Sequence, residues 1–196
     1  MWSCHDRPRM EASPGFFLLL GISFWLDEGV GLLPWGLLAC VLHELGHMVA
    51  ATVMGGRVEA LSLTVVGAEL RIDYRAPLTY LQDSLVALAG PATNLLWGVA
   101  ALALHLELAA MLTLAIGAFN LLPISPLDGG RVVHGLLANR LDPDWADRVM
   151  TVMSGCLVGI LVGVGAVAAI HYANITLLLT ALWLLAGMFH QGRDSI

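Results

Sequence analysis

The segment VLHELGHMVA, Val41–Ala50, places two histidines and a glutamate inside an apolar stretch of about residues 30–54. Ionisable side chains within a membrane span are costly, so they usually serve a function. A spacing of four puts His43 and His47 on one face of a helix, one turn apart. Two imidazoles at this spacing can bind one zinc ion. The segment therefore predicts a metal site on a membrane helix.

Glu44 is the residue that would make this metal site catalytic. It directly follows His43, so it can reach a water molecule on the metal, take its proton and deliver the proton to a leaving amine. The alternative is a purely structural cluster of polar side chains that hydrogen-bond to one another between helices. The cost of burying ionisable groups in a membrane favours the catalytic interpretation.

The composition is that of a membrane protein. Of the 196 residues, 58% are hydrophobic and 12% are charged, which is about half of the charged fraction of a soluble domain. The length then predicts one integral-membrane domain, residues 1–196, in place of two soluble domains. The net charge is −6, lysine is absent, and no basic patch suggests nucleic acid as a partner.

Six apolar segments predict an all-α polytopic fold with about six transmembrane helices. The first, fourth and sixth are short, because a spanning helix needs about 20 residues. Gly90-Pro91 is expected to interrupt the third segment. The segments lie at about residues 14–26, 30–54, 84–106, 108–124, 149–170 and 175–189.

The arginines indicate the orientation of these spans. Six alternating spans place all nine basic residues on one side, which the positive-inside rule makes cytosolic. Both termini are therefore predicted to be cytosolic. The opposite loops carry Asp27, Glu28, Glu107 and His171. The basic residues are Arg7, Arg9, Arg57, Arg71, Arg75, Arg131, Arg140, Arg148 and Arg193.

A small β-hairpin is predicted between the second and third apolar segments. Apolar and polar residues alternate over Leu61–Val65 and again over Leu70–Tyr74, on the two sides of Gly67. An isolated hairpin is marginally stable in water. We therefore expect it to pack on the helix bundle or on the membrane surface.

A catalytic zinc site usually needs a third protein ligand besides two histidines. The best candidate is Asp128 in FNLLPISPLDGGR, Phe119–Arg131, after a proline-broken apolar stretch. Non-helical backbone at membrane depth is tolerated only against protein or a wet cavity, where a carboxylate could reach a metal. By itself Asp128 could also be a turn residue or a helix N-cap, but its occurrence with HELGH favours the ligand.

Two amides and a cysteine are weaker candidates. Asn94 in GPATN and Asn120 before the proline stretch could bind a substrate backbone or join helices. Cys40 lies one turn before His43 and could face the metal, although a packed thiol is favoured. Surface or interfacial positions are expected for His105, His134, His171 and His190.

HELGH and NLLPISPLDGG, both at apolar segments and in this order, together resemble the site-2 protease family of intramembrane zinc metalloproteases, peptidase family M50. That family carries HExxH on one span and an LDG-type motif on a later one, and GPATN looks like its Gly-Pro-x-x-Asn element. The compact layout is most similar to the branch that contains the bacterial sporulation factor IVFB protease. The resemblance covers about Val30 to Arg140.

The resemblance implies that His43, His47 and Asp128 bind one Zn²⁺ per chain. Glu44 would be the general base and Asn120 a candidate substrate contact. The implied enzyme is a multi-pass protein of a bacterial cytoplasmic membrane. It would hydrolyse a peptide bond in or near a transmembrane segment of another protein, with the lipid bilayer and a membrane regulator as partners. The sequence offers no room for the PDZ or CBS domains of some members, and it does not indicate the oligomeric state.

Two further expectations follow from this chemistry. A substrate helix must unwind before it is cut, and a free β-strand edge at Leu61–Val65 or Leu70–Tyr74 could pair with the unwound strand. The alternative function is a membrane transporter of metal ions or protons that uses the histidine and glutamate cluster. Transport is disfavoured because the polar groups converge on one site, where a transporter would space them along a path.

Overall fold

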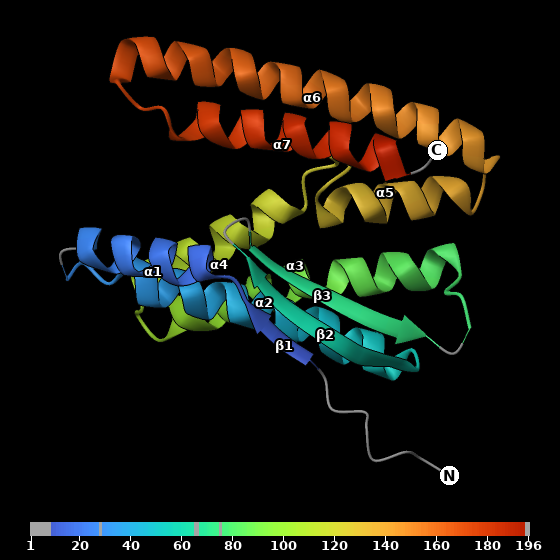
Figure 1. The fold of residues 1–196 in the computed structure, drawn as a ribbon, viewed down its shortest axis with the longest axis horizontal. Coiled ribbons are helices and arrows are strands. Elements are labelled where there is room, and N and C mark those ends of the chain that lie inside the picture. Colours follow the sequence, from blue (N-terminus) through green and yellow to red (C-terminus); the bar gives the residue numbers. More distant parts are fainter. Residues whose placement is uncertain (1–8, 28, 65–66, 75, 195–196) are drawn as a thin grey trace. The chain divides into compact units, whose positions relative to one another are not determined.

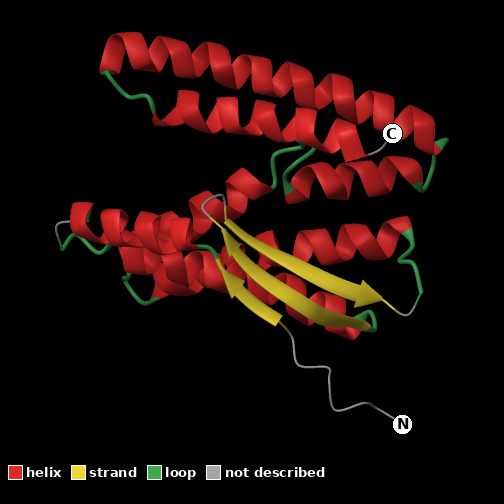
Figure 2. Ribbon diagram, in the orientation of Figure 1, coloured by secondary structure: helices red, strands yellow, loops and turns green. Residues whose placement is uncertain are grey.

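The structure is a computed structural model that describes residues 9–27, 29–64, 67–74 and 76–194. Arg7, Glu28, Val65 and Arg75 lie outside the described residues, so the predictions that fall on them have no structural counterpart. The chain is mostly helical with one small sheet (Figures 1 and 2). It divides into two compact units, Met1–Phe119 and Asn120–Ile196. The prediction of a single domain stays a prediction.

The first unit holds the HELGH helix, a three-stranded sheet and three further helices. Its last helix, α4, ends at Asn120, the first residue of the second unit. The elements are β1 (Arg9–Ala12), α1 (Pro14–Leu26), α2 (Leu32–Val53), β2 (Gly56–Thr64), β3 (Gly67–Tyr74), α3 (Tyr80–Ala103) and α4 (Glu107–Asn120).

The starts of these helices follow from local capping. The Ser13 hydroxyl accepts a hydrogen bond from Phe16 N, with Pro14 as the first helical residue of α1. The Asp27 carboxylate accepts from the backbone N–H groups of Gly31 and Leu33 at the start of α2. Such bonds satisfy donors that a helix leaves unpaired at its N-terminus.

Helices α2 and α3 pack closely because small residues line their contact. A Cβ added at Gly46 would meet the Ala89 carbonyl and the Thr93 side chain of α3. Glycine at such points lets two backbones approach, which is how membrane helices associate without a strong hydrophobic drive. The third apolar segment forms one continuous helix through Gly90-Pro91, so the expected interruption is wrong.

The sheet has three strands, where the sequence pattern predicted a two-stranded hairpin. β2 and β3 pair in an antiparallel manner, as predicted, with an irregularity between Val58 and Ala60. β1 adds to the other edge of β2 in parallel, with Met10 opposite Leu61 and Ala12 opposite Leu63. The four residues of β1 alternate polar and apolar side chains, but a strand was not predicted there. The sheet packs on α2.

The second unit is helical in its described part. α5 (Asp128–Ala138) packs on α6 (Pro143–Tyr172), and α6 and α7 (Thr176–Asp194) lie side by side (Figure 1). Asp142 caps α6 by accepting from Asp144 N, and Pro143 is the first helical residue. The sequence pattern did not predict α5, because its eleven residues include three glycines and form no long apolar segment.

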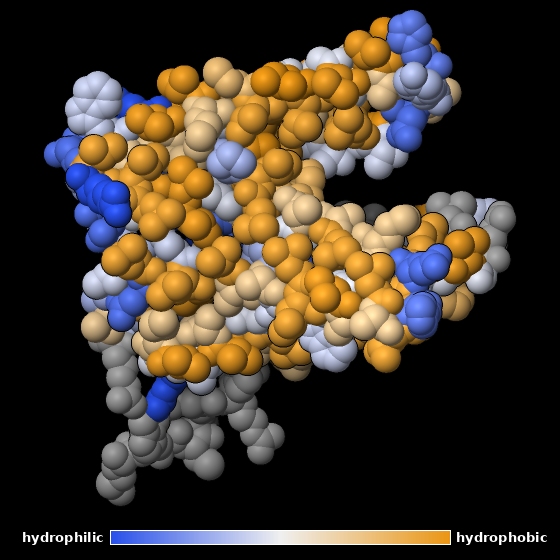
Figure 3. Space-filling model, turned by 180° about the vertical axis from the view of Figure 1, so that it is seen from behind, coloured by the Kyte–Doolittle hydropathy of each residue, from blue (hydrophilic) through white to orange (hydrophobic). Residues whose placement is uncertain are grey.

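Within the described residues, three helices are long and apolar enough to cross a membrane: α2, α3 and α6. Shorter apolar helices lie at Pro14–Trp25, Glu107–Asn120 and Thr176–Met188. Large apolar side chains point outward, among them Leu96 of α3 at 72% exposure and Ile160 of α6 at 62%. Figure 3 shows apolar side chains over most of the visible face, with hydrophilic ones mainly toward its margins. These exposed surfaces fit a lipid environment, whereas the count of six spans stays a prediction.

Candidate metal centre

One face of α2 carries both histidines into the protein interior. The buried residues Ala39, His43, His47 and Ala51 recur every four positions. His43 and His47 are 7% and 8% exposed, and their rings lie edge to face with centroids 4.7 Å apart. Their Nε2 atoms are 3.1 Å apart. Two nitrogens on one tetrahedral zinc ion lie about 3.3 Å apart, so the pair fits a shared metal.

The orientation of His47 is fixed by the backbone of α3. Its Nδ1 lies 2.8 Å from the carbonyl oxygen of Val86. A carbonyl oxygen only accepts hydrogen bonds, so Nδ1 must carry the proton of the neutral ring and donate it. Nε2 then presents its lone pair toward His43. Backbone carbonyls often fix metal-binding histidines in this way, and HELGH alone gave no sign of Val86.

The orientation of His43 depends on Asn94 of α3. The amide Nδ2 of Asn94 lies 3.3 Å from His43 Nδ1, and Asn94 is fully buried. The sequence left two interpretations of Asn94 open, a substrate contact and a link between helices. The structure shows the link between α2 and α3, and a substrate contact by Asn94 stays a prediction.

Gly90 is a site residue that sequence reasoning missed. A Cβ added there would collide with the His47 ring at Nε2, Cε1 and Cδ2. Only glycine therefore leaves room for the ring where α3 passes α2. The available signal was the Gly90-Pro91 pair inside an apolar helix, where glycine is otherwise unfavourable.

Glu44 and Cys40 occupy different environments on α2. Glu44 is half-buried and precedes the tightly packed Gly46 by two positions. Cys40 is exposed and free. The expectation of a packed thiol at Cys40 is therefore wrong, since this side of α2 carries apolar residues outward.

Asp128 belongs to the second unit, where it is the first residue of α5. The N-cap is Leu127, not Asp128, so the capping interpretation of Asp128 is wrong. A carboxylate in the first turn is stabilised in its charged form by the helix dipole, which suits a metal ligand. Asp128 is half-buried.

The loop before Asp128 is shaped by glycines and by α6. Cβ atoms added at Gly129 and Gly130 would collide with the carbonyl groups of Leu121 and Ile124. The Ser125 N–H donates to the Ser154 hydroxyl of α6 at 2.9 Å, and Ser154 is fully buried. These contacts explain the two glycines of the motif, which let the loop fold back onto the first turn of α5.

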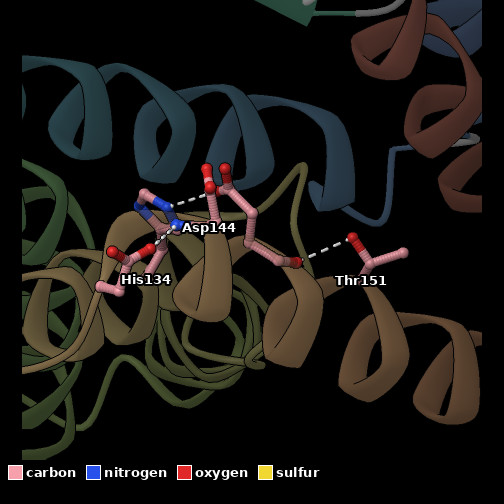
Figure 4. A network of polar contacts seen from close by, with 5 residues as sticks. His134, Asp144 and Thr151 are labelled. Atoms are coloured by element: carbon pink, nitrogen blue, oxygen red, sulfur yellow. Dashed lines mark hydrogen bonds and ion pairs between the residues drawn. The ribbon is translucent and has the colours of Figure 1, made fainter.

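The other predicted residues each lie within their own helix or loop. Asn120 is the half-buried last residue of α4. His105 and His171 are exposed, as expected, and the side chain of His190 lies outside the described residues. His134 Nε2 of α5 lies 2.7 Å from Asp147 Oδ1 of α6, and the Thr151 hydroxyl donates to the Asp147 carbonyl (Figure 4).

Two models of known protein families match this chain. Residues 17–127 match the model of the peptidase M50B-like family, and residues 100–164 match that of peptidase family M50. The chain belongs to the M50B-like peptidase family. The resemblance to site-2 proteases in the sequence is thereby confirmed.

Individual relatives agree with this family. The chain is 30% identical over 112 residues to a zinc metalloprotease of Methanocaldococcus jannaschii, covering 51% of this chain and 32% of that protein. It is 28% identical over 148 residues to stage IV sporulation protein FB of Bacillus subtilis, covering 67% of this chain and 51% of that protein. The chain thus spans about a third to a half of the length of these curated relatives.

A solved structure shows the same fold. The site-2 protease from Methanocaldococcus jannaschii superposes with a TM-score of 0.69 at 23% identity, covering 97% of this chain and 93% of that chain. The three helices that are long and apolar enough to cross a membrane indicate that this family member is an integral membrane protein.

Proposed function

We propose that this protein is an intramembrane zinc metalloprotease that hydrolyses a peptide bond in or near a transmembrane segment of a membrane-protein substrate. The observation that carries the proposal is the pair of buried Nε2 atoms of His43 and His47, 3.1 Å apart on a helix apolar enough to span a membrane. Family membership supports the same activity.

In this proposal His43, His47 and Asp128 hold one zinc ion per chain. Each offers one ligand atom, the histidines being buried and Asp128 half-buried. Two imidazoles and one carboxylate form a common ligand set of catalytic zinc, which leaves one position open. Zinc bound there would polarise the scissile carbonyl and lower the pKa of a water molecule.

Glu44 acts as the proton carrier of the hydrolysis. Its carboxylate accepts a proton from the attacking water while the water oxygen forms a bond to the scissile carbonyl carbon. The carbon–nitrogen bond then breaks, and Glu44 returns the proton to the leaving amine. A half-buried position on α2 suits this role, because the carboxylate must meet both water and substrate. Asn120 is proposed to hydrogen-bond the substrate backbone.

The remaining expectations about the setting belong to the same proposal. They comprise six spans, both termini in the cytosol of a bacterial cell, and a membrane regulator. The comparisons lend no support to the alternative of a metal or proton transporter, whereas they include zinc metalloproteases.

The free edge of β3 is the proposed docking strand for the unwound substrate. β2 is the central strand of the sheet, so Leu61–Leu63 pair on both sides and that half of the sequence expectation is wrong. Leu70–Tyr74 of β3 pair with β2 on one side only among the described residues. Edge strands bind extended peptides through backbone hydrogen bonds, so the free edge of β3 could bind the unwound substrate in this way.

Proline substitution tests this docking strand. Adjacent residues of a strand alternate in the direction of their N–H groups, so Arg71→Pro and Ile72→Pro each remove one donor, and one of the two faces the free edge. That variant should slow cleavage while binding as much zinc as wild type. Cleavage at the wild-type rate in both folded variants would contradict docking on β3.

The activity itself is tested by comparing new protein N-termini in cell membranes. Cells would express wild type or Glu44→Gln at matched levels. New termini in or beside transmembrane segments are expected with wild type alone. If the two profiles match, and a co-expressed panel of membrane-protein substrates also stays uncut, the proposal of an intramembrane protease fails.

A further inference from the structure

Three hydrogen bonds form a chain from the Val86 carbonyl through His47 and His43 to Asn94. His47 Nδ1 donates to the Val86 carbonyl, so His47 Nε2 is an acceptor. His43 Nε2 lies 3.1 Å from His47 Nε2 and donates a hydrogen bond to it. The Nδ1 of His43 then lacks a proton and accepts from the Asn94 amide nitrogen at 3.3 Å. This arrangement places the ring proton of His43 on Nε2.

A metal on His43 Nε2 requires the opposite tautomer. The ring then keeps its single proton on Nδ1, and Nδ1 becomes a donor. An amide nitrogen facing it would set two donors against each other, which is unfavourable in a buried site. An oxygen in the same place would accept the bond.

The amide oxygen of Asn94 can replace the amide nitrogen as the hydrogen-bond partner of His43 Nδ1. Among the described residues, Asn94 Oδ1 is a buried polar atom without a hydrogen-bond partner. Turning the amide by a half circle exchanges oxygen and nitrogen and hardly alters its shape. This turn of the amide breaks no hydrogen bond of Oδ1, because Oδ1 makes none before the turn.

We propose that Asn94 is the positioning residue of His43 and that its amide turns when zinc binds. Oδ1 then accepts from His43 Nδ1–H and fixes the ring so that Nε2 points at the metal. The inference rests on the proposed function, since it takes His43 as a zinc ligand. Histidine ligands typically donate their second N–H to such an acceptor.

Two substitutions separate this role from simple packing. Asn94→Asp keeps an acceptor of the same shape, whereas Asn94→Leu keeps the number of side-chain heavy atoms and removes both polar atoms. Thr113→Val is the matched control, because Thr113 is also buried and its hydroxyl donates within its own helix to Ala109. All proteins would be the full chain, purified in detergent.

Zinc affinity is measured by competition with a chelator of known affinity. Asn94→Leu should bind zinc about 10- to 100-fold more weakly than wild type, while Asn94→Asp and Thr113→Val should stay close to wild type. The role of Asn94 would be overturned if Asn94→Leu bound zinc as tightly as wild type. It would also be overturned if Asn94→Asp bound zinc as weakly as Asn94→Leu. A wild type that takes up no zinc would refute the proposed function as well.

A second measurement needs no variant and so does not depend on folding of a mutant. Nitrogen–proton correlation spectra of protein labelled in its histidines report which ring nitrogen carries the proton. On zinc addition, the proton of His43 should move from Nε2 to Nδ1, while His47 should keep its proton on Nδ1. A proton on His43 Nδ1 already present before zinc is added would contradict the turning amide.

Discussion

Glu44→Gln is expected to bind zinc as wild type does and to lose nearly all proteolysis. Glutamine has almost the shape of glutamate but cannot accept a proton from water and pass it on. General acid–base groups contribute about 10²- to 10⁴-fold to a reaction rate, so the cleavage rate should fall by about that factor. The rate would be measured on purified protein with a membrane-protein substrate, alongside the zinc content of the same sample.

Glu107→Gln is the matched control for this substitution. Glu107 is an exposed glutamate in the first turn of α4, and its change removes the same charge outside the metal centre. Cleavage by this variant should equal that of wild type. If Glu44→Gln cleaves as fast as the control, Glu44 is not the base. Loss of zinc along with activity would point to a role for Glu44 in holding the metal.

Gly90→Ala is expected to abolish zinc binding by displacing the His47 ring. The added methyl group would occupy the place of His47 Nε2 and its neighbouring ring carbons. The ring could escape only by breaking its hydrogen bond to the Val86 carbonyl or by pushing α3 away from α2. Overpacking of this kind typically costs about 1–3 kcal/mol of stability. Zinc content and the thermal unfolding midpoint would be measured together.

Gly155→Ala separates this collision from a general effect of glycine. Gly155 lies within α6, and an added Cβ there meets no atom within 4 Å. Alanine is the better helix former, so this variant should bind zinc fully and unfold at the same or a slightly higher temperature. Full zinc occupancy in Gly90→Ala would show that the ring does not need the space that glycine leaves.

Local patterns in the sequence predicted most of the helices and strands of this protein and the side chains of its proposed metal site. The four-residue spacing places His43 and His47 on one face wherever the segment is helical, because this follows from the geometry of the turn alone. The apolar segments recur as helices, and the alternation over residues 61–74 recurs as β2 and β3. The family match confirmed the resemblance to the site-2 protease family that HELGH and the LDG motif carried.

Tertiary structure decided which distant residues contact the two histidines and how the strands and helices pair and continue. Val86 lies 39 residues from His47 and Asn94 lies 51 residues from His43, so no local pattern could connect them. β1 is held by pairing with β2, because a strand of four residues is not stable without a partner strand. The helix through Gly90-Pro91 persists because packing against α2 outweighs the local preference of glycine and proline to break it. The sequence alone thus determined which groups could bind a metal, and long-range packing decided how the two histidine rings are held.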